Sequence, residues 1–428
     1  MKKTMEVKPK IETFARIKVL GIGGSGTNAV NRMSELGIRG VEFISINTDA
    51  QALHNNNADK KVHIGKTITK GLGSGMNPDL GRQAAEENAD ELEEVLASAD
   101  MVFVTCGLGG GTGTGAAPVV AEIAKRMGIL TVAVVTRPFT FEGSQRKEIA
   151  ELGYDTLKEN VDAIISIHND RILQIIDKKT SLIEAFRTVD EVLRQGIAGI
   201  SDLITTHGIV NADFADIKTI MQDAGTALMG IGRGNGENRA HDAALQAINS
   251  PLLELSIDGA KGVLFNITGG SSLGMFEIDE AAKVITRNID SSAKVKFGAV
   301  IDESLGEELR ITVIATGFDE AQIRKAQAQP REIPRQAERS RPAPIQPTPS
   351  SVAGPEPAFQ RQQPSASAVP PTSAPQSAPE ETKEAPVRKP FFNLTPDQPA
   401  PSMIADTPEH DDSEDLLDIP AFIRKRMK

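Results

Sequence analysis

Gly107-Leu-Gly-Gly-Gly-Thr-Gly-Thr-Gly115 lies between an apolar run at Met101–Thr105 and a helical pattern at Gly115–Met127. Five of the seven residues from Gly109 to Gly115 are glycine, and the other two are threonine. Ordering such a segment loses much backbone entropy, and its residues have almost no side chain to pack. A purely structural role is therefore hard to defend. Consecutive amides and two hydroxyls instead suit a cradle for two or three phosphates.

An earlier glycine-rich loop, Gly21–Asn28, also stands between an apolar run and a helical pattern. Its glycines let the backbone approach a phosphate, and the helix that follows offers free N–H groups. Gly21, Gly23 and Gly26 satisfy the dinucleotide fingerprint G-x-G-x-x-G, with Asp49 about where a ribose-binding acid would fall. An NAD- or FAD-dependent oxidoreductase is thus an alternative, although it has no use for residues 109–115.

A third loop, Gly71-Leu-Gly-Ser-Gly-Met-Asn-Pro78, precedes another helical pattern. Loops that follow the strands of one parallel sheet can converge at the carboxyl edge of that sheet. Several charge-assisted hydrogen bonds, at roughly 1.5–3 kcal/mol each, would then hold a triphosphate. Gly65-Lys66-Thr67 resembles the end of a P-loop, but the first glycine that a P-loop requires is replaced by Lys60. A P-loop enzyme is therefore excluded.

Apolar runs alternate with helical patterns through the first half of the chain, which predicts an α/β fold with a parallel sheet. The runs are Ile17–Leu20, Val41–Ile46, Met101–Thr105, Ile129–Thr136 and Ala163–Ile167. The helical patterns are near Asn28–Leu36 and at Gly81–Ser98, Gly115–Met127 and Gly143–Asn160. A long apolar stripe from Leu182 to about Thr206 predicts a helix buried between two domains.

A smaller α/β unit is predicted after this helix. Its expected strands are Ala227–Ile231, Gly262–Thr268, Lys294–Val300 and Arg310–Thr316, and its expected helices are Asn238–Asn249 and Glu277–Asn288. Most of the 25 prolines lie after residue 320, where no apolar periodicity remains, so that region is predicted to be disordered. Near the end, Asp415–Arg426 restores Leu, Ile and Phe, which predicts a segment that orders on a partner.

Six regions are therefore expected along the chain. They are an N-terminal tail (1–13), a nucleotide-binding domain (14–181), a central helix (182–207), a second, smaller domain (208–320), a disordered Pro-rich linker (321–410) and a partner-binding peptide (411–428).

Composition narrows the classes of function. The formal net charge of −11 and the pI near 5.2 argue against a nucleic-acid-binding protein. The chain has no signal-peptide pattern and no apolar run of about 18 residues, so we expect no membrane span. Its one cysteine, Cys106, favours a reducing compartment and is predicted to be a buried apolar residue. The six histidines are not clustered, so no protein metal site is predicted.

The loop at Gly109–Gly115 resembles the diagnostic loop of the tubulin/FtsZ superfamily. Further segments resemble the FtsZ family of bacterial cell-division GTPases in the family order, namely Asn47–Leu53, Phe139–Gly143, Asn211–Asp216 and Asp418–Phe422. The resemblance covers about residues 14–320 and the last dozen. It implies a GTPase with a GTP-binding domain, a central helix and a second domain, which forms head-to-tail filaments.

The resemblance also implies which residues contact GTP or GDP. They are Gly24, Ser25, Gly26, Thr27, Asn28, Gly75, Gly110, Gly111, Thr112, Gly113, Glu142, Arg146, Asn169 and Asp190. Among them Glu142 and Arg146 would lie at the ribose and phosphates, while Asn169 and Asp190 would read guanine. Mg²⁺ would be held mainly through the nucleotide phosphates.

The residues alone leave ordinary alternatives open. Glu142 and Arg146 are also spaced as a solvent-exposed i, i+4 ion pair. Asp190 could be a solvated helix position, and Asn169 could be a turn residue.

The acidic segment Asn211–Asp216 has two compatible interpretations. Asp213 can cap a helix over Phe214–Gln222, and Asp216 suits its first turn. The resemblance implies in addition that Asn211, Asp213 and Asp216 reach the nucleotide of the next subunit, where the carboxylates position the attacking water. Catalysis would then need two copies of the chain. A tubulin-like scaffold that does not hydrolyse nucleotide is the remaining alternative.

The implied partners are other copies of the chain and division adaptors such as FtsA, bound through Asp415–Arg426. The implied location is the cytoplasm, with assembly into a ring at midcell.

Overall fold

The computed structural model describes residues 15–318, except 39, 178, 207, 211, 254 and 288. The predicted tail, linker and terminal peptide lie outside the described residues, as does Asn211.

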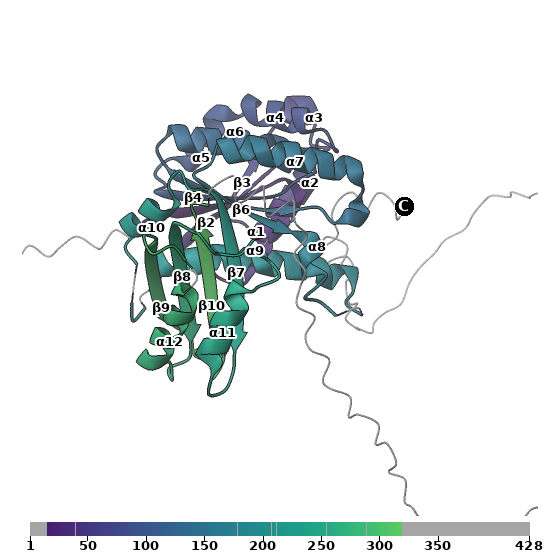
Figure 1. The fold of residues 1–428 in the computed structure, drawn as a ribbon. Coiled ribbons are helices and arrows are strands. Elements are labelled where there is room, and N and C mark those ends of the chain that lie inside the picture. The colour runs from purple at the N-terminus through teal and green to yellow at the C-terminus, as the bar shows by residue number, and fades with distance from the viewer. Residues whose placement is uncertain are drawn as a thin grey trace, which may run out of the picture. The chain divides into compact units, whose positions relative to one another are not determined.

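The first half of the chain forms a parallel sheet, as predicted (Figure 1). Its strands are β1 (Ile17–Ile22), β2 (Val41–Asn47), β3 (Lys60–His63), β4 (Met101–Gly107), β5 (Leu130–Arg137) and β6 (Ala163–His168). They are ordered β3-β2-β1-β4-β5-β6, so the direction of winding reverses between β1 and β4. Loops at such a reversal leave a crevice at the carboxyl ends of the strands. The glycine loops after β1 and β4 stand at this point.

Helices cover both faces of this sheet (Figure 1). The helices of the first half are α1 (Gly23–Glu35), α2 (Ala50–His54), α3 (Lys66–Thr69), α4 (Pro78–Glu87), α5 (Ala89–Leu96), α6 (Thr112–Arg126), a 3₁₀ turn η1 (Thr140–Glu142), α7 (Ser144–Glu159) and α8 (Asn169–Ile172). Apolar residues of α4, α5, α6 and α7 share one core cluster with one face of the strands. Residues of α1, α8 and the long helix α9 (Leu182–Thr205) pack against the other face.

The structure corrects three details of the sequence prediction. The helix expected at Gly81–Ser98 is two helices, because Asn88 leaves helical geometry and its side chain accepts a hydrogen bond from the Gly65 amide at 2.9 Å. The edge strand β3 was not predicted, since two of its four residues are exposed lysines. Helices α1 and α6 begin inside the glycine loops, at Gly23 and Thr112, rather than after them.

The second half contains α10 (Phe214–Met221), β7 (Gly225–Gly234), α11 (Arg239–Ile248), β8 (Gly262–Gly269), α12 (Met275–Thr286), β9 (Lys294–Ile301), η2 (Glu303–Leu305) and β10 (Leu309–Thr316). The two halves share one ten-stranded sheet. Strand β7 makes the connection, because Gly225–Ala227 pairs in parallel with β6 and Leu228–Gly234 pairs antiparallel with β10. This continuity was not predicted, since apolar periodicity does not report which strands pair.

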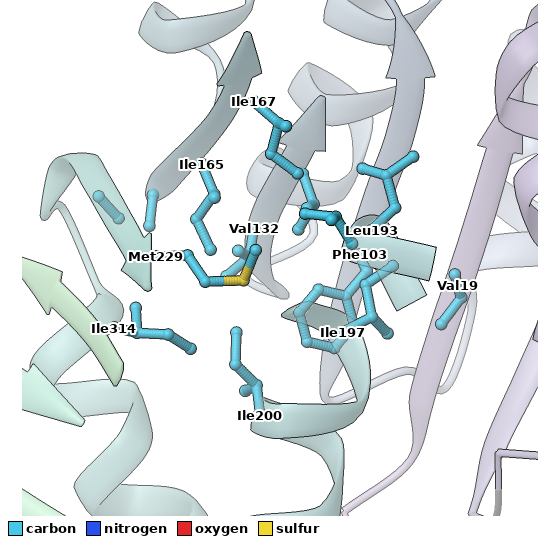
Figure 2. Close-up of a cluster of buried hydrophobic side chains, with 14 of the residues drawn as sticks. Val19, Phe103, Val132, Ile165, Ile167, Leu193, Ile197, Ile200, Met229 and Ile314 are labelled. Atoms are coloured by element: carbon cyan, nitrogen blue, oxygen red, sulfur yellow. The ribbon is translucent and has the colours of Figure 1, made fainter. Parts of the chain in front are cut away.

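Helix α9 contributes to a core that both halves share (Figure 2). Leu193, Ile197 and Ile200 of α9 lie in one cluster with strand residues of the first half and with Met229 and Ile314 of the second. Glycines allow the close packing, because a Cβ on Gly196 would lie 2.6 Å from the Met229 sulfur. The predicted long helix is therefore present, and its apolar stripe is buried against residues of both halves. No helix among the described residues has the length and apolar character needed to cross a membrane.

Candidate active site

The three glycine loops touch one another at the carboxyl edge of the sheet. The Gly111 amide donates a hydrogen bond to the Gly75 carbonyl at 3.0 Å, which joins the second loop to the third. The hydroxyls of Ser74 and Thr112 lie 2.7 Å apart and strengthen the same junction. The first loop meets the second just as closely, since a Cβ on Gly23 would lie 2.7 Å from the Gly113 nitrogen. Segments far apart in the sequence thus form one surface of backbone amides.

The hydroxyls of the second loop already have protein partners. Thr114 Oγ1 accepts a hydrogen bond from the Gly109 amide at 2.9 Å. Thr112 Oγ1 lies 2.6 Å from Thr48 Oγ1, in addition to its contact with Ser74. Both threonine side chains therefore hold the loops in shape. Thr114 acts only as an acceptor in this bond, so its own proton is not used there, and the expectation that two hydroxyls take part in the phosphate cradle stays a prediction.

The glycines of this region serve two different purposes. A Cβ on Gly26 would lie 2.4 Å from the Thr105 carbonyl oxygen, and one on Gly111 would lie 2.5 Å from Ser74 Oγ. These two glycines allow close packing within the protein. A Cβ on Gly24 would meet nothing within 4 Å, and one on Gly110 would meet only an atom 4.0 Å away. Gly24 and Gly110 therefore face open space, where a ligand can approach the backbone.

The first turn of α1 supplies further amides to this open side. The first N–H groups of a helix have no intrahelical partner and carry partial positive charge, so they favour a phosphate. Thr27 is the fifth residue of α1 and follows this turn. Its hydroxyl is buried and donates to the carbonyl oxygens of Gly23 and Gly24 at 2.8 and 3.0 Å, so it holds the turn in shape, and a direct contact of Thr27 with nucleotide stays a prediction.

A pocket next to these loops collects six of the residues predicted to bind nucleotide. They are Ser25 and Asn28 of α1, Glu142 of η1, Arg146 of α7, Asn169 of α8 and Asp190 of α9. The pocket is also lined by Phe186, which was not predicted. Its ring packs edge-on against Phe139 at a centroid distance of 5.6 Å, so the pocket has an apolar wall. The apolar stripe of α9 made Phe186 look like an ordinary core position.

Glu142 and Arg146 form the ion pair that their spacing allows, but the pair is not solvent-exposed. Arg146 Nε lies 3.0 Å from Glu142 Oε2, and their side chains are 12% and 4% exposed. Burial lowers the pKa of Arg146, and the Glu142 carboxylate opposes this shift. The Phe139 amide also donates to Glu142 Oε1 at 2.9 Å. Both charged groups are therefore held in place at the pocket.

Asn169 and Asp190 also differ from their ordinary alternatives. Asn169 is only 5% exposed, and its side-chain oxygen has no hydrogen-bond partner among the described residues. A buried polar atom without a partner is costly, so this oxygen is suited to a ligand donor. Asp190 lies 3.6 Å from Arg32 Nε, with a side chain that is 17% exposed. Its carboxylate is therefore largely buried and paired, rather than solvated on the surface of the helix. The sequence analysis did not identify its partner Arg32.

The acidic segment lies apart from this pocket in the described structure. Asp213 caps α10 by accepting a hydrogen bond from the Ala215 amide at 3.4 Å. Asp216 in the first turn pairs with Lys296 of β9, at 2.8 Å between Nζ and Oδ2. Neither residue lines the pocket. The predicted capping role is thus present, and the described residues of one copy do not bring these carboxylates to the other candidates.

Cys106, at the end of β4, is buried as expected. Burial raises the pKa of its thiol to about 12, so the side chain is an uncharged packing group.

Known proteins resemble both halves of the chain. Residues 16–177 match the Tubulin/FtsZ family, GTPase domain, and residues 225–319 match the FtsZ family, C-terminal domain. A solved FtsZ dimer from M. jannaschii is 45% identical with a TM-score of 0.70, and the match covers 72% of this chain and 90% of that chain. A mutant of M. jannaschii FtsZ is also 45% identical, with a TM-score of 0.69 and coverage of 71% and 91%.

More distant structures share the fold alone. CetZ2 from Haloferax volcanii, solved as a GTPγS-bound protofilament, is 20% identical with a TM-score of 0.61. That match covers 73% of this chain and 98% of the CetZ2 chain.

Proposed function

The chain belongs to the FtsZ family of tubulin-like, filament-forming GTPases, and from this premise we propose that it hydrolyses GTP at the junction between two of its own copies. Membership of this family excludes the two alternative hypotheses, which were an oxidoreductase and a scaffold that does not hydrolyse nucleotide. The finer proposal concerns where hydrolysis occurs. Its main support is that the nucleotide pocket and the acidic segment occupy separate places in one copy.

The pocket residues fit a guanine nucleotide. Gly24 and Gly110 leave open space beside amides that can bind phosphate oxygens. Arg146 can offset phosphate charge, and Glu142 can accept hydrogen bonds from the ribose. The Asn169 oxygen, which has no partner in the described part of the chain, can accept from a base N–H, and Asp190 can supply a second acceptor. Gly75 would contribute indirectly, because its carbonyl oxygen accepts a hydrogen bond from the Gly111 amide and so holds the second glycine loop in place.

The metal would be bound chiefly by the nucleotide. The described residues contain no group of three or more His, Cys, Asp or Glu side chains that could hold a metal ion. Mg²⁺ usually keeps several waters and binds through substrate phosphates with one or two carboxylates. When bound, it would offset the charge that develops on the phosphates during transfer.

The acidic segment would complete the site of a neighbouring copy. Asp213 is exposed and Asp216 is partly exposed at the start of α10, so a second molecule can reach both carboxylates. Phosphoryl transfer depends mainly on positioning of the reactants and on stabilisation of charge. An acidic group that orients the attacking water contributes to the positioning. Asn211 precedes them in the chain and is included in the proposal from its place in the motif.

Dependence on protein concentration tests catalysis between copies. We expect the full-length protein to bind GTP as a monomer, and its GTP turnover per molecule to fall steeply as the protein is diluted. Phosphate release and sedimentation should be measured over the same dilution series. Turnover per molecule that stays constant down to nanomolar protein would refute the proposal.

The wider assignment is a bacterial division ring that assembles in the cytoplasm at midcell. It is supported by the FtsZ family match and by the motif Asp418–Phe422 within Asp415–Arg426. We propose that this terminal segment binds adaptors such as FtsA. Removing residues 412–428 should abolish adaptor pull-down while GTP turnover stays intact. Retained pull-down would contradict the role of the segment.

A further inference from the structure

We propose that Asp170 is a positioning residue for nucleotide binding, which joins the loop that carries Glu142 to the helix that carries Asn169. The Thr140 amide donates a hydrogen bond to Asp170 Oδ1 at 2.9 Å, and the Thr140 hydroxyl donates to Oδ2. One carboxylate thus binds two donors of a single residue. This inference rests on the proposed function, because it concerns the same pocket.

The loop that Asp170 binds, residues 138–143, extends from the sheet toward solvent and needs a contact that fixes its outer part. It leaves the sheet after Arg137 of β5, which lies beside His168 of β6 in the parallel register. Phe139 fixes the inner end, because its ring is 1% exposed within the core. The next aromatic residue, Phe141, is 62% exposed and stacks on Phe139 at a centroid distance of 4.9 Å. The clamp between Thr140 and Asp170 therefore lies where the loop turns outward toward solvent.

The clamp also acts on the helix that carries Asn169. Helix α8 has only four residues, so its backbone hydrogen bonds restrain it weakly. Asn169 and Asp170 are its first two residues, and Asn169 lines the pocket while Asp170 does not. Binding Asp170 to Thr140 fixes the position of Asn169 relative to Glu142.

This arrangement predicts an effect on affinity rather than on the chemical step. Without the clamp, the loop and α8 would have to be ordered when nucleotide binds, and that ordering costs conformational entropy. Asp170 is not among the pocket residues and so has no direct part in phosphoryl transfer. Loss of the hydrogen bonds between Asp170 and Thr140 should therefore raise the KM for GTP and leave kcat at saturating GTP unchanged.

The test is a titration of a fluorescent GDP derivative into full-length protein, because GDP avoids turnover. We expect Asp170→Ala to weaken the Kd by about tenfold, which corresponds to about 1.4 kcal/mol. Thr140→Val removes one of the two donors and should weaken binding less, while Thr140→Ser should restore it. Adding Thr140→Val to Asp170→Ala should have no further effect, since the pair acts as a unit.

A matched control removes a similar aspartate that also binds the amide and the hydroxyl of one residue, but in the second half of the chain. Asp290 Oδ1 accepts hydrogen bonds from both the amide and the hydroxyl of Ser292, each at 2.7 Å. Asp290→Ala should leave the Kd for GDP unchanged. An equal loss in this control, or wild-type affinity in Asp170→Ala, would overturn the inference. If Asp170→Ala does not fold, wild-type affinity in Thr140→Val overturns it instead. Failure of the wild-type protein to bind GDP would refute the proposed function itself.

Discussion

The two halves of the chain present their candidate residues in opposite ways. In the first half, side chains from α1, η1, α7 and α8 converge with side chains of α9 on one pocket beside the glycine loops. In the second half, Asp213 caps a helix and Asp216 pairs with a lysine, and neither reaches that pocket. Under the proposed function, nucleotide binding is completed within one molecule, whereas hydrolysis requires another. Substitutions at four places in the molecule can break or sharpen this contrast.

The largest effect is expected from the acidic segment. Asp213→Asn and Asp216→Asn should each lower kcat about 100-fold or more, because a lost group that positions water typically costs 10²–10⁴-fold. GDP affinity should stay unchanged, since neither residue lines the pocket. Phosphate release and GDP titration measure the two quantities separately. Asp155→Asn, an exposed carboxylate of α7, serves as the control. Nucleotide affinity that falls together with kcat would remove the contrast between the halves.

The next effect concerns the helix shared by both halves. Burial raises the pKa of Asp202 in α9 to about 6, and Asp302 also raises it, while Arg194 and Arg310 oppose the shift. The folded protein therefore disfavours the ionised carboxyl. This cost is absent only well below pH 3.8, where the group is protonated in both the folded and the unfolded state, and it grows as pH rises until pH is above 6. Asp202→Asn should thus raise the free energy of unfolding by about 3 kcal/mol at pH 8.

Denaturant unfolding at pH 4, 6 and 8 measures this dependence. The advantage of Asp202→Asn over wild type should shrink as pH falls from 6 to 4. An advantage that is constant with pH would show that ionisation of Asp202 is not its cause.

Substitutions of two nearby glycines, Gly24 and Gly26, distinguish an effect on stability from an effect on nucleotide affinity. Gly26→Ala places a methyl 2.4 Å from a backbone oxygen, so it should cost about 1–3 kcal/mol of stability. Gly24→Ala meets nothing within 4 Å, so stability should be kept while nucleotide affinity falls several-fold. Thermal unfolding without nucleotide and GDP titration give the two results. If Gly24→Ala binds GDP as wild type does, the open side of the loop does not face the phosphates.

The smallest effect is expected at the Asp216–Lys296 pair. Both side chains are substantially exposed, at 40% and 45%, so Lys296→Ala should change stability by at most about 1 kcal/mol. The nucleotide pocket is elsewhere, and GDP affinity should not change. Chemical denaturation measures the stability. A larger loss would show that the pair is a structural element and not a carboxylate available to a neighbouring copy.

Much of the nucleotide-binding half follows from local sequence. Near-continuous apolar strands can be buried on both faces only in a parallel sheet covered by helices, and the runs from Ile17 to Ile167 have this character. The density of glycine at 109–115 indicates a phosphate cradle because no other use repays the entropy of ordering it. The roles of Glu142, Asn169 and Asp190 came from family resemblance and remain proposals.

Other features required the tertiary structure, because they depend on contacts between distant residues. The partners of Thr112, the salt bridge of Arg32 with Asp190 and the clamp of Asp170 on Thr140 join segments with no shared local pattern. The continuous sheet through β7 is of the same kind. Periodicity along the chain records which faces are buried, but packing in three dimensions decides which buried faces meet. The sequence alone therefore predicts most of the elements and is the source of the phosphate-binding proposal, whereas contacts between distant residues assemble the pocket.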